Sequence, residues 1–425
     1  MSNQEVQHPK YGSGIVKLAR NNGYMLLVTF QDGMSRWVKL TELLQNKTPQ
    51  KLEETPKTSD FSDERFKLRQ MIEAFRLGIV PYDFLTDFTF GRDQEIDHIR
   101  NWLNSDESGS LFVLGEYGTG KTHLLHYSLS YALKNNFATA WVEMDPNEAP
   151  FCNPKRVYRK LLKEFKYCDR NSGEIKYFRD FIKSVVKQNI LIDNKLIQHI
   201  KHNLNDETFW HWIEGEDINR ISKVPTLYKS STSANIYCYL LSSFGWAATQ
   251  LGLRGLFIVF DEAETIAMNN SSYQDEKSKN FIKSLLLTAN NDEQLLNNPS
   301  STGLSYCGIG EGPSIPFLYK KNSGLKLLFA FTNLDWNLSY LSDFYKKTTI
   351  SEVANTPKLN LSNLSLEDLR KVFEHLYELY MKAYEFKFKS NDADKAFEKL
   401  IDKNVKQTRL FVKGTVEILD ILRLG

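Results

Sequence analysis

The sequence has little of what marks secreted, membrane-spanning or metal-scaffolded proteins. Its four cysteines, Cys152, Cys168, Cys238 and Cys307, are far apart and form no C-x-x-C pair, so neither a zinc site nor a disulfide framework is indicated. No apolar run approaches the roughly 20 residues that a membrane-spanning helix needs, and the first ten residues lack the apolar core of a secretory signal. We therefore expect a cytoplasmic protein with reduced thiols and no membrane contact.

The chain also lacks an excess of charge of either sign. Its 425 residues include 54 Lys and Arg against 52 Asp and Glu, a formal net charge of +2. A balance so close to zero does not by itself indicate binding to nucleic acid, so any such contact needs a local patch. The length exceeds that of one ordinary hydrophobic core, which predicts two or three domains.

Four segments follow one another along the chain. We predict a small all-β barrel of the SH3 or Tudor type at 1–48, because Asn-Asn-Gly and Asp-Gly separate its β-rich runs. A polar, proline-punctuated linker covers 49–65. The third segment, 66–358, alternates apolar strands with helices, which is typical of a parallel α/β sheet, and contains a helical insertion at about 150–250. Helical patterns fill 359–425, the predicted C-terminal lid.

The most specific motif is a glycine-rich bend that reads GEYGTGKT at 115–122, between an apolar strand and a helix. The glycines let backbone N–H groups converge on phosphate oxygens, and the helix N-terminus adds its positive end. Lys121 is predicted to reach the β- and γ-phosphates, and the Thr122 hydroxyl to ligate Mg²⁺. We predict that ATP binds along the whole bend: Gly115, Glu116, Tyr117, Gly118, Thr119, Gly120, Lys121, Thr122 and His123.

A second motif, GLFIVFDEAE at 255–264, carries two acids to the end of an apolar strand. Ligands bind at the carboxyl edge of open parallel sheets. Asp261 is expected to hold Mg²⁺ through water, and Glu262 to be the base that orients the attacking water. Glu264 is expected to lie behind them. The alternative, a solvated loop start, is disfavoured by the matching phosphate motif upstream.

Two further positions leave alternatives open. The strand 325–333 ends in Thr332 and Asn333, where a polar side chain can hold the same water or sense the γ-phosphate; otherwise it caps the strand. Arg409 opens a C-terminal helix and either folds back onto the phosphates or is a surface charge. We count Asn333 as a catalytic candidate beside Lys121 and Glu262, and Arg409 as a nucleotide ligand.

Taken together, the motifs resemble those of a known family. GRDQEIDHIRNWL at 91–103 resembles the segment that precedes the P-loop in AAA+ ATPases of the origin-recognition and signalling type. FRLGIVP at 75–81, the P-loop, FWHWIEGE at 209–216 and the acidic strand together resemble the ATP-binding proteins of bacterial BREX phage-defence loci, the BrxD type. The resemblance implies an AAA+-like ATPase that works beside a helicase on DNA.

The first 45 residues have a resemblance of their own. HPKYGSGIV and VTFQDGMSRWVKLTEL are similar to the Tudor-like modules appended to superfamily-one repair helicases. Such modules dock on other proteins or on nucleic acid, so the resemblance implies a protein partner for this segment. Its aromatic residues are either an exposed face for that partner or the core of the barrel: Tyr11, Tyr24, Phe30 and Trp37.

The sequence departs from the AAA+ pattern at one point. Oligomeric members supply an arginine in trans from the helix after the third strand, but no arginine occurs between Arg254 and Arg370, and Lys346 and Lys347 occupy that place. We therefore keep two functions open. One is a Mg²⁺-dependent ATPase of BREX-like antiphage defence, and the other is a signalling-type switch that binds ATP tightly, assembles and hydrolyses slowly.

Contact with DNA and assembly into homo-oligomers are further expectations. The stretches 155–167 and 177–188 interleave Lys and Arg with aromatic residues. Phosphate-binding surfaces have this composition, and so do solvated helices with one apolar face. Any DNA binding is expected to be sequence-tolerant, because no base-reading helix is recognisable.

Overall fold

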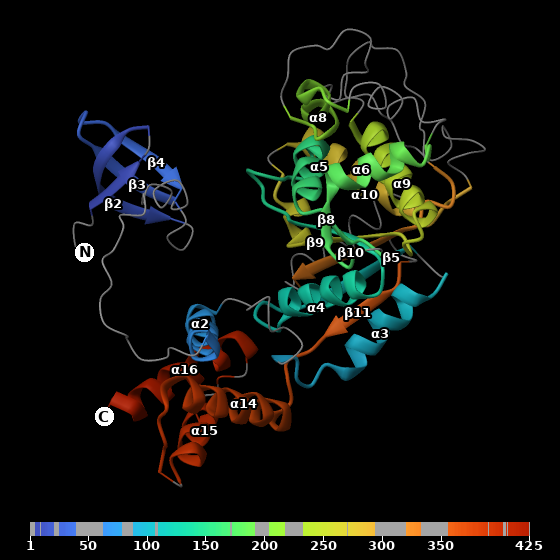
Figure 1. Ribbon diagram of the computed structural model, residues 1–425. Helices are drawn as coiled ribbons and strands as arrows, with labels where there is room; N and C mark the ends of the chain where they lie inside the picture. Colours follow the sequence, from blue (N-terminus) through green and yellow to red (C-terminus); the bar gives the residue numbers. More distant parts are fainter. Residues whose placement is uncertain are drawn as a thin grey trace. The chain divides into compact units, whose positions relative to one another are not determined.

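The computed structural model describes the following residues: 5–8, 10–20, 25–39, 63–78, 88–106, 109–170, 172–191, 204–216, 233–269, 271–293, 320–332, 356–389, 391–402, 405 and 407–424. The chain divides into two compact units, Met1–Phe61 and Ser62–Gly425, whose elements are labelled in Figure 1. Each unit is described by itself.

The first unit contains a four-stranded antiparallel sheet in the order β1-β2-β3-β4. Its strands are β1 (Glu5–His8), β2 (Gly12–Arg20), β3 (Met25–Phe30) and β4 (Ser35–Lys39). Phe30 is buried with Val28 and Val38, so it belongs to the core. Tyr11 is half-buried, and its ring centroid lies 5.4 Å from that of Phe30. The guanidinium carbon of Arg36 lies over the Tyr11 ring, 4.7 Å from its centroid. The small all-β unit is confirmed, whereas its likeness to Tudor modules stays a prediction.

The second unit is built on a seven-stranded sheet in the order β11-β5-β10-β9-β6-β7-β8. The neighbours from β11 to β6 run parallel, and β7 and β8 extend the sheet antiparallel. The strands are β5 (Ser110–Gly115), β6 (Ala138–Glu143), β7 (Lys166–Cys168), β8 (Ile175–Tyr177), β9 (Leu256–Asp261), β10 (Leu325–Thr332) and β11 (Lys358–Leu361). The predicted α/β class with a largely parallel sheet is confirmed.

Helices cover both faces of this sheet, which is why its central strands read as continuous apolar runs. Successive residues of β9 enter different cores: Phe257 and Val259 pack with α3 (Asp93–Asn104) and α4 (Lys121–Lys134), and Ile258 and Phe260 pack on the opposite face. That face carries α5, α6, α9 and α10 (Figure 1). The bounds of the helices there are α5 (Pro154–Lys163), α6 (Phe178–Lys187), α8 (Glu207–Ile213), α9 (Ser233–Gln250) and α10 (Ser272–Ala289).

A separate helical bundle contains the C-terminal helices and also α2, which precedes the sheet in the chain. Its members are α2 (Asp63–Leu77), α14 (Leu366–Tyr384), α15 (Asp392–Asp402) and α16 (Thr408–Leu424). The Ser365 hydroxyl caps α14 by accepting from the Asp368 backbone N–H at 3.1 Å. From α2, Met71, Ile72 and Phe75 enter the apolar core of the bundle.

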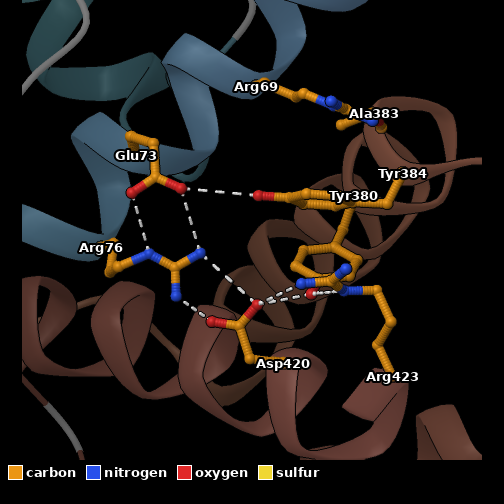
Figure 2. A network of polar contacts seen from close by, with 8 residues as sticks. All are labelled: Arg69, Glu73, Arg76, Tyr380, Ala383, Tyr384, Asp420 and Arg423. Atoms are coloured by element: carbon orange, nitrogen blue, oxygen red, sulfur yellow. Dashed lines mark hydrogen bonds and ion pairs between the residues drawn. The ribbon is translucent and has the colours of Figure 1, made fainter.

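A polar network fixes α2 to α14 and α16 (Figure 2). The guanidinium of Arg76 donates to Glu73 on its own helix and to Asp420 on α16. Tyr380 donates its hydroxyl to the same aspartate at 2.5 Å and accepts from Arg423 at 2.8 Å. Because these groups come from three helices, α2 is held as a member of the C-terminal bundle.

Among the described residues no helix is long and apolar enough to cross a membrane. Three residues that the sequence analysis singles out lie outside the described residues: Asn333, Lys346 and Lys347.

Candidate nucleotide site

The glycine-rich bend has the backbone that a phosphate-binding loop requires. Strand β5 ends at Gly115, helix α4 begins at Lys121, and the turn between them includes Gly118 at φ 82° and Gly120 at φ 96°. Only glycine adopts such angles without strain. A Cβ added to Gly120 would meet no heavy atom within 4 Å, and α4 has no side-chain cap. The loop therefore presents uncapped N–H groups beside open space, which suits phosphate oxygens.

Lys121 is folded into this loop. Its side chain is buried, and Nζ donates to the carbonyl oxygens of Gly115 and Glu116, at 3.0 Å each. Burial lowers the pKa of Lys121, and three nearby carboxylates oppose that shift, those of Glu264, Glu262 and Asp261. A buried ammonium group with neutral carbonyl partners is suited to exchange them for charged phosphate oxygens.

The predicted cation ligands meet directly. Thr122 Oγ1 donates to Asp261 Oδ2 at 2.9 Å, and Asp261 Oδ1 accepts from the Glu262 N–H at 2.9 Å. Burial raises the pKa of Asp261, and the bond from Thr122 counteracts it. Hydroxyl and carboxylate oxygens are the ligands Mg²⁺ prefers, with phosphate and water filling its other positions. The described residues contain no group of three or more His, Cys, Asp or Glu side chains that could hold a metal ion.

Glu262 is half-buried, and Glu264 is buried beside it; that Glu264 lies behind Asp261 and Glu262 stays a prediction. Glu262 has a left-handed backbone, φ 53° and ψ 37°, which is uncommon for a non-glycine residue and typical of functional sites. Burial, followed by the charge of Glu264, raises the pKa of Glu262 to about 8. Glu264 is 6% exposed and exerts the largest charge effect on Lys121. Its place beside Lys121 was not predicted.

Strand β10 lies between the two motif strands, pairing with β5 on one side and β9 on the other. Its last residue, Thr332, is buried and opposite Gly115 in the parallel register. The end of β10 therefore lies at the start of the phosphate loop, where the sequence places a polar group.

Arg92, the residue before α3, lies at the site, but the sequence analysis does not predict it. Its only sequence signal is the segment 91–103, which resembles the one before the P-loop in AAA+ ATPases. Its buried guanidinium donates to the carbonyl oxygens of Thr119 in the P-loop, at 2.8 Å, and Ser362 after β11, at 2.7 Å. His123 shares a 2.8 Å hydrogen bond with Thr89. Burial, together with the charge of Arg92, lowers the pKa of His123 to about 4. Both residues tie the segment before α3 to the phosphate loop.

Arg409 reaches the P-loop from the start of α16. Its guanidinium donates to the Tyr117 hydroxyl at 2.8 Å, and its backbone N–H donates to the carbonyl oxygen of Gly118 at 3.3 Å. Tyr117 is 57% exposed. Arg409 itself is exposed and lies beside the phosphate loop, and its contact with the phosphates stays a prediction.

Some of the basic residues proposed for DNA contact are paired with acids. Lys160 on α5 pairs with Glu148 at 2.9 Å. Arg179 on α6 binds Glu214 at 2.7 Å and Glu207 at 2.9 Å, and both acids lie on or next to α8. These ion pairs join α5 and α6 to neighbouring segments and neutralise part of the positive charge of the two stretches.

Comparison with known proteins gives distant structural neighbours and one family. No curated protein sequence matches significantly. The Walker-type ATPase PABY2304 of Pyrococcus abyssi aligns at 14% identity and a TM-score of 0.39, over 78% of this chain and 68% of that one. AMPPCP-bound DnaA from Aquifex aeolicus aligns at 12% identity and a TM-score of 0.36, over 80% and 65%.

The family comparison covers most of the chain. The family described as BREX system ATP-binding protein BrxC/D matches residues 64–208 and 211–424, which include the P-loop, the acidic strand and the C-terminal bundle. The chain belongs to this family, the BREX system ATP-binding proteins BrxC/D.

Proposed function

We propose that the chain is a Mg²⁺-dependent ATPase of a BREX-type antiphage defence system, acting with a helicase on or near DNA. The observation that carries the enzymatic part is the hydrogen bond between Thr122 and Asp261. It joins the P-loop helix to the acidic strand at the point where a nucleotide-bound cation needs both oxygens. The family description supports ATP as the nucleotide.

Each side chain has a separate task in this proposal. Lys121 gives up its carbonyl partners for the β- and γ-phosphates, and Thr122 and Asp261 hold Mg²⁺, which neutralises phosphate charge when bound. Glu262 orients the attacking water and accepts its proton. Asn333 is proposed, from the sequence alone, to hold the same water from the next strand.

The test is to measure ATP binding and turnover separately. Lys121→Ala is expected to abolish nucleotide binding, because it removes the positive charge that stabilises the phosphates. Glu262→Gln is expected to keep binding and to lose at least about 100-fold in turnover, because its role is confined to the chemical step. Lys134→Ala, at the other end of α4, is the matched control. Wild-type turnover by Glu262→Gln would refute the assignment of the base.

The absence of arginine between Arg254 and Arg370 favours slow hydrolysis by the isolated protein. An arginine finger is typically worth roughly 10³–10⁵ in rate, and lysine lacks its planar, bidentate fork. We therefore expect turnover to accelerate when DNA or a protein partner is added. Fast turnover by the wild type alone, independent of protein concentration, would contradict this.

The same absence also supports the second candidate, a switch that binds ATP tightly, assembles and hydrolyses slowly. The two functions differ in what ATP changes. Light scattering of the wild type and of Glu262→Gln, with and without ATP, distinguishes them. ATP-dependent assembly without stimulation of turnover by DNA indicates the switch, whereas stimulation by DNA indicates the helicase-associated ATPase.

DNA contact is proposed to use phosphates only, and a protein partner is proposed to bind the first unit. Because Lys160 and Arg179 are already paired with acids, we expect weak DNA binding that is tolerant of sequence and loses roughly tenfold or more in affinity between 50 and 200 mM salt. An affinity that is insensitive to salt would exclude this mode.

A further inference from the structure

Arg409 differs from the other arginines that join helices in the C-terminal bundle. Arg76 contacts two carboxylates, as does Arg370. Within the described ranges no carboxylate lies within ion-pair distance of Arg409. Its guanidinium donates instead to the neutral hydroxyl of Tyr117. Among the residues that the structure describes, this cation at the edge of the phosphate loop thus has no acid as its counter-charge.

Tyr117 is the P-loop side of this contact. It belongs to the turn between β5 and α4, and its side chain is 57% exposed. The guanidinium carbon of Arg409 lies 5.9 Å from the centroid of its ring. The contact is reinforced at the backbone, where the Arg409 N–H donates to Gly118. Since both groups are exposed, water competes for this hydrogen bond and makes it inexpensive to break.

The start of α16 follows the loop closely at a second point. The atom nearest to a Cβ built on Gly118 is Gln407 Oε1, at 3.4 Å. Three contacts thus join the start of α16 to the middle of the P-loop. They are the Gln407 side chain beside Gly118, the backbone bond from Arg409 to Gly118, and the Tyr117–Arg409 pair. Arg409 belongs to α16, whose residues Phe411, Val416 and Leu419 lie in the core of the C-terminal bundle.

We propose that Tyr117 is a latch that holds Arg409 in the nucleotide-free state, and that phosphate oxygens of bound ATP displace the tyrosine hydroxyl as the partner of the guanidinium. The proposal rests on the proposed function, since it requires ATP at the P-loop. Its physical basis is that a bond from arginine to a phosphate oxygen joins two opposite charges and can be bidentate, whereas the bond to the tyrosine hydroxyl has a neutral acceptor. Tyr117 acts through Arg409 and is a positioning residue.

The decisive variant is Tyr117→Phe, which keeps the ring and removes the hydroxyl. Because the resting contact no longer competes, ATP affinity is expected to rise about two- to tenfold, the range that one hydrogen bond contributes. Arg409→Ala is expected to lower ATP affinity, and adding Tyr117→Phe to Arg409→Ala is expected to change nothing further. This double-mutant cycle separates the latch from an unrelated effect of the loop.

Tyr127→Phe is a matched control, because the Tyr127 hydroxyl also accepts from an arginine, Arg100, and that arginine also lies over the ring. The pair joins α3 and α4 away from the turn, so this variant should bind ATP like the wild type. Weaker ATP binding by Tyr117→Phe would show that the hydroxyl serves the bound state and would refute the latch. If Tyr117→Phe bound ATP with the same affinity as the wild type, the latch would be refuted as well.

A second measurement tests the latch without nucleotide. Amide hydrogen exchange in the first turn of α16, residues 408–411, is expected to rise about two- to tenfold in nucleotide-free Tyr117→Phe and to stay unchanged in Tyr127→Phe. Unchanged exchange in Tyr117→Phe overturns the latch. Failure of the wild type to bind ATP overturns the proposed function, so the two failures are distinguishable.

Discussion

At the scale of single residues, the site combines unusual backbone angles with buried ionisable groups. Gly120 and Glu262 both have positive φ, at the two points where the P-loop and the acidic strand turn toward each other. For the non-glycine residue Glu262 this angle costs about 1–3 kcal/mol and persists only where the surrounding structure enforces it, whereas Gly120 adopts it without steric cost. They are therefore sensitive positions for substitution.

Gly120→Ala is expected to reduce stability by about 1–2 kcal/mol through backbone strain and to weaken ATP binding at least about tenfold, since the new methyl group enters the space beside the loop. Gly173 is the matched control: it also has positive φ, 71°, and open space around a built Cβ, but it lies in the turn between β7 and β8. Gly173→Ala should lower the melting temperature without affecting ATP binding. Equal loss of binding in both variants would contradict the role of Gly120.

His126 predicts how stability depends on pH. Burial, then the charges of His123 and Lys166, lowers its pKa to about 4 from 6.5, and its ring packs on Trp141 at 4.8 Å. Between these values the unfolded state binds more protons than the folded state, so stability is complete above pH 6.5 and falls as pH drops toward 4. The loss attributable to His126 is roughly 2–3 kcal/mol at pH 4.5.

Urea denaturation of wild type and His126→Phe, from pH 7.5 to 4.5, checks this expectation. Phenylalanine keeps an aromatic ring against Trp141 and cannot take up a proton. The variant should therefore lose less stability on acidification than the wild type does. A slope identical to that of the wild type would show that His126 does not contribute.

At the scale of helices, α2 packs on helices that are distant from it in the sequence. It precedes the nucleotide-binding sheet, yet its apolar residues enter the core of the C-terminal bundle, and its arginine pairs with Asp420 on α16. Since α16 also contacts the P-loop through Arg409, one helix connects the nucleotide site with α2. Movement of α16 at the P-loop is expected to displace α2 with it.

Asp420→Ala is expected to cost about 1–3 kcal/mol of stability, because it leaves Arg76, Arg423 and the hydroxyl of Tyr380 without their shared acceptor. Asp394→Ala is the matched control, since Asp394 also binds an arginine of another helix, Arg370, but is 60% exposed. That variant should cost no more than about 1 kcal/mol. Thermal unfolding and hydrogen exchange in α2 measure both. Similar costs for the two variants would contradict the anchoring role of Asp420.

At the scale of the whole molecule, the two compact units have separate cores, and the family match begins at residue 64, after the first unit. The domain limits suggested by the sequence stay a prediction. The helix α2 directly follows the first unit but has its apolar contacts in the second. A truncation before α2 removes only the first unit, whereas a truncation after α2 also removes a helix of the C-terminal bundle. Comparing the two therefore separates the contribution of the first unit from that of α2.

Deletion of residues 1–61 is expected to leave the melting temperature of the second unit and its ATP affinity unchanged. Deletion of residues 1–78 also removes α2, and with it the buried side chains of Met71, Ile72 and Phe75. At about 1.5–3 kcal/mol for each buried side chain, the bundle should lose several kcal/mol. Calorimetry of both truncations decides the matter. A shorter deletion that already unfolds the second unit would refute its independence.

The sequence alone determined what depends on neighbouring residues. The P-loop, the acidic strand and the apolar runs of the sheet are local patterns, because phosphate binding needs consecutive N–H groups and a buried strand needs consecutive apolar residues. The α/β class, the small antiparallel sheet and the family resemblance were therefore predictable. The sequence could also place Thr122 and Asp261 at one edge, since the carboxyl ends of parallel strands share that edge.

Only the tertiary structure decided which distant residues meet. Arg409 and Tyr117 are 292 positions apart, Arg92 and Ser362 are 270 apart, and Arg76 and Asp420 are 344 apart. No periodicity encodes such pairs, because they arise when helices formed by separate segments pack their apolar faces together and bring their polar rims into contact. For the same reason α2 joined the bundle rather than the sheet, and the partner of Arg409 became visible only after the chain was folded.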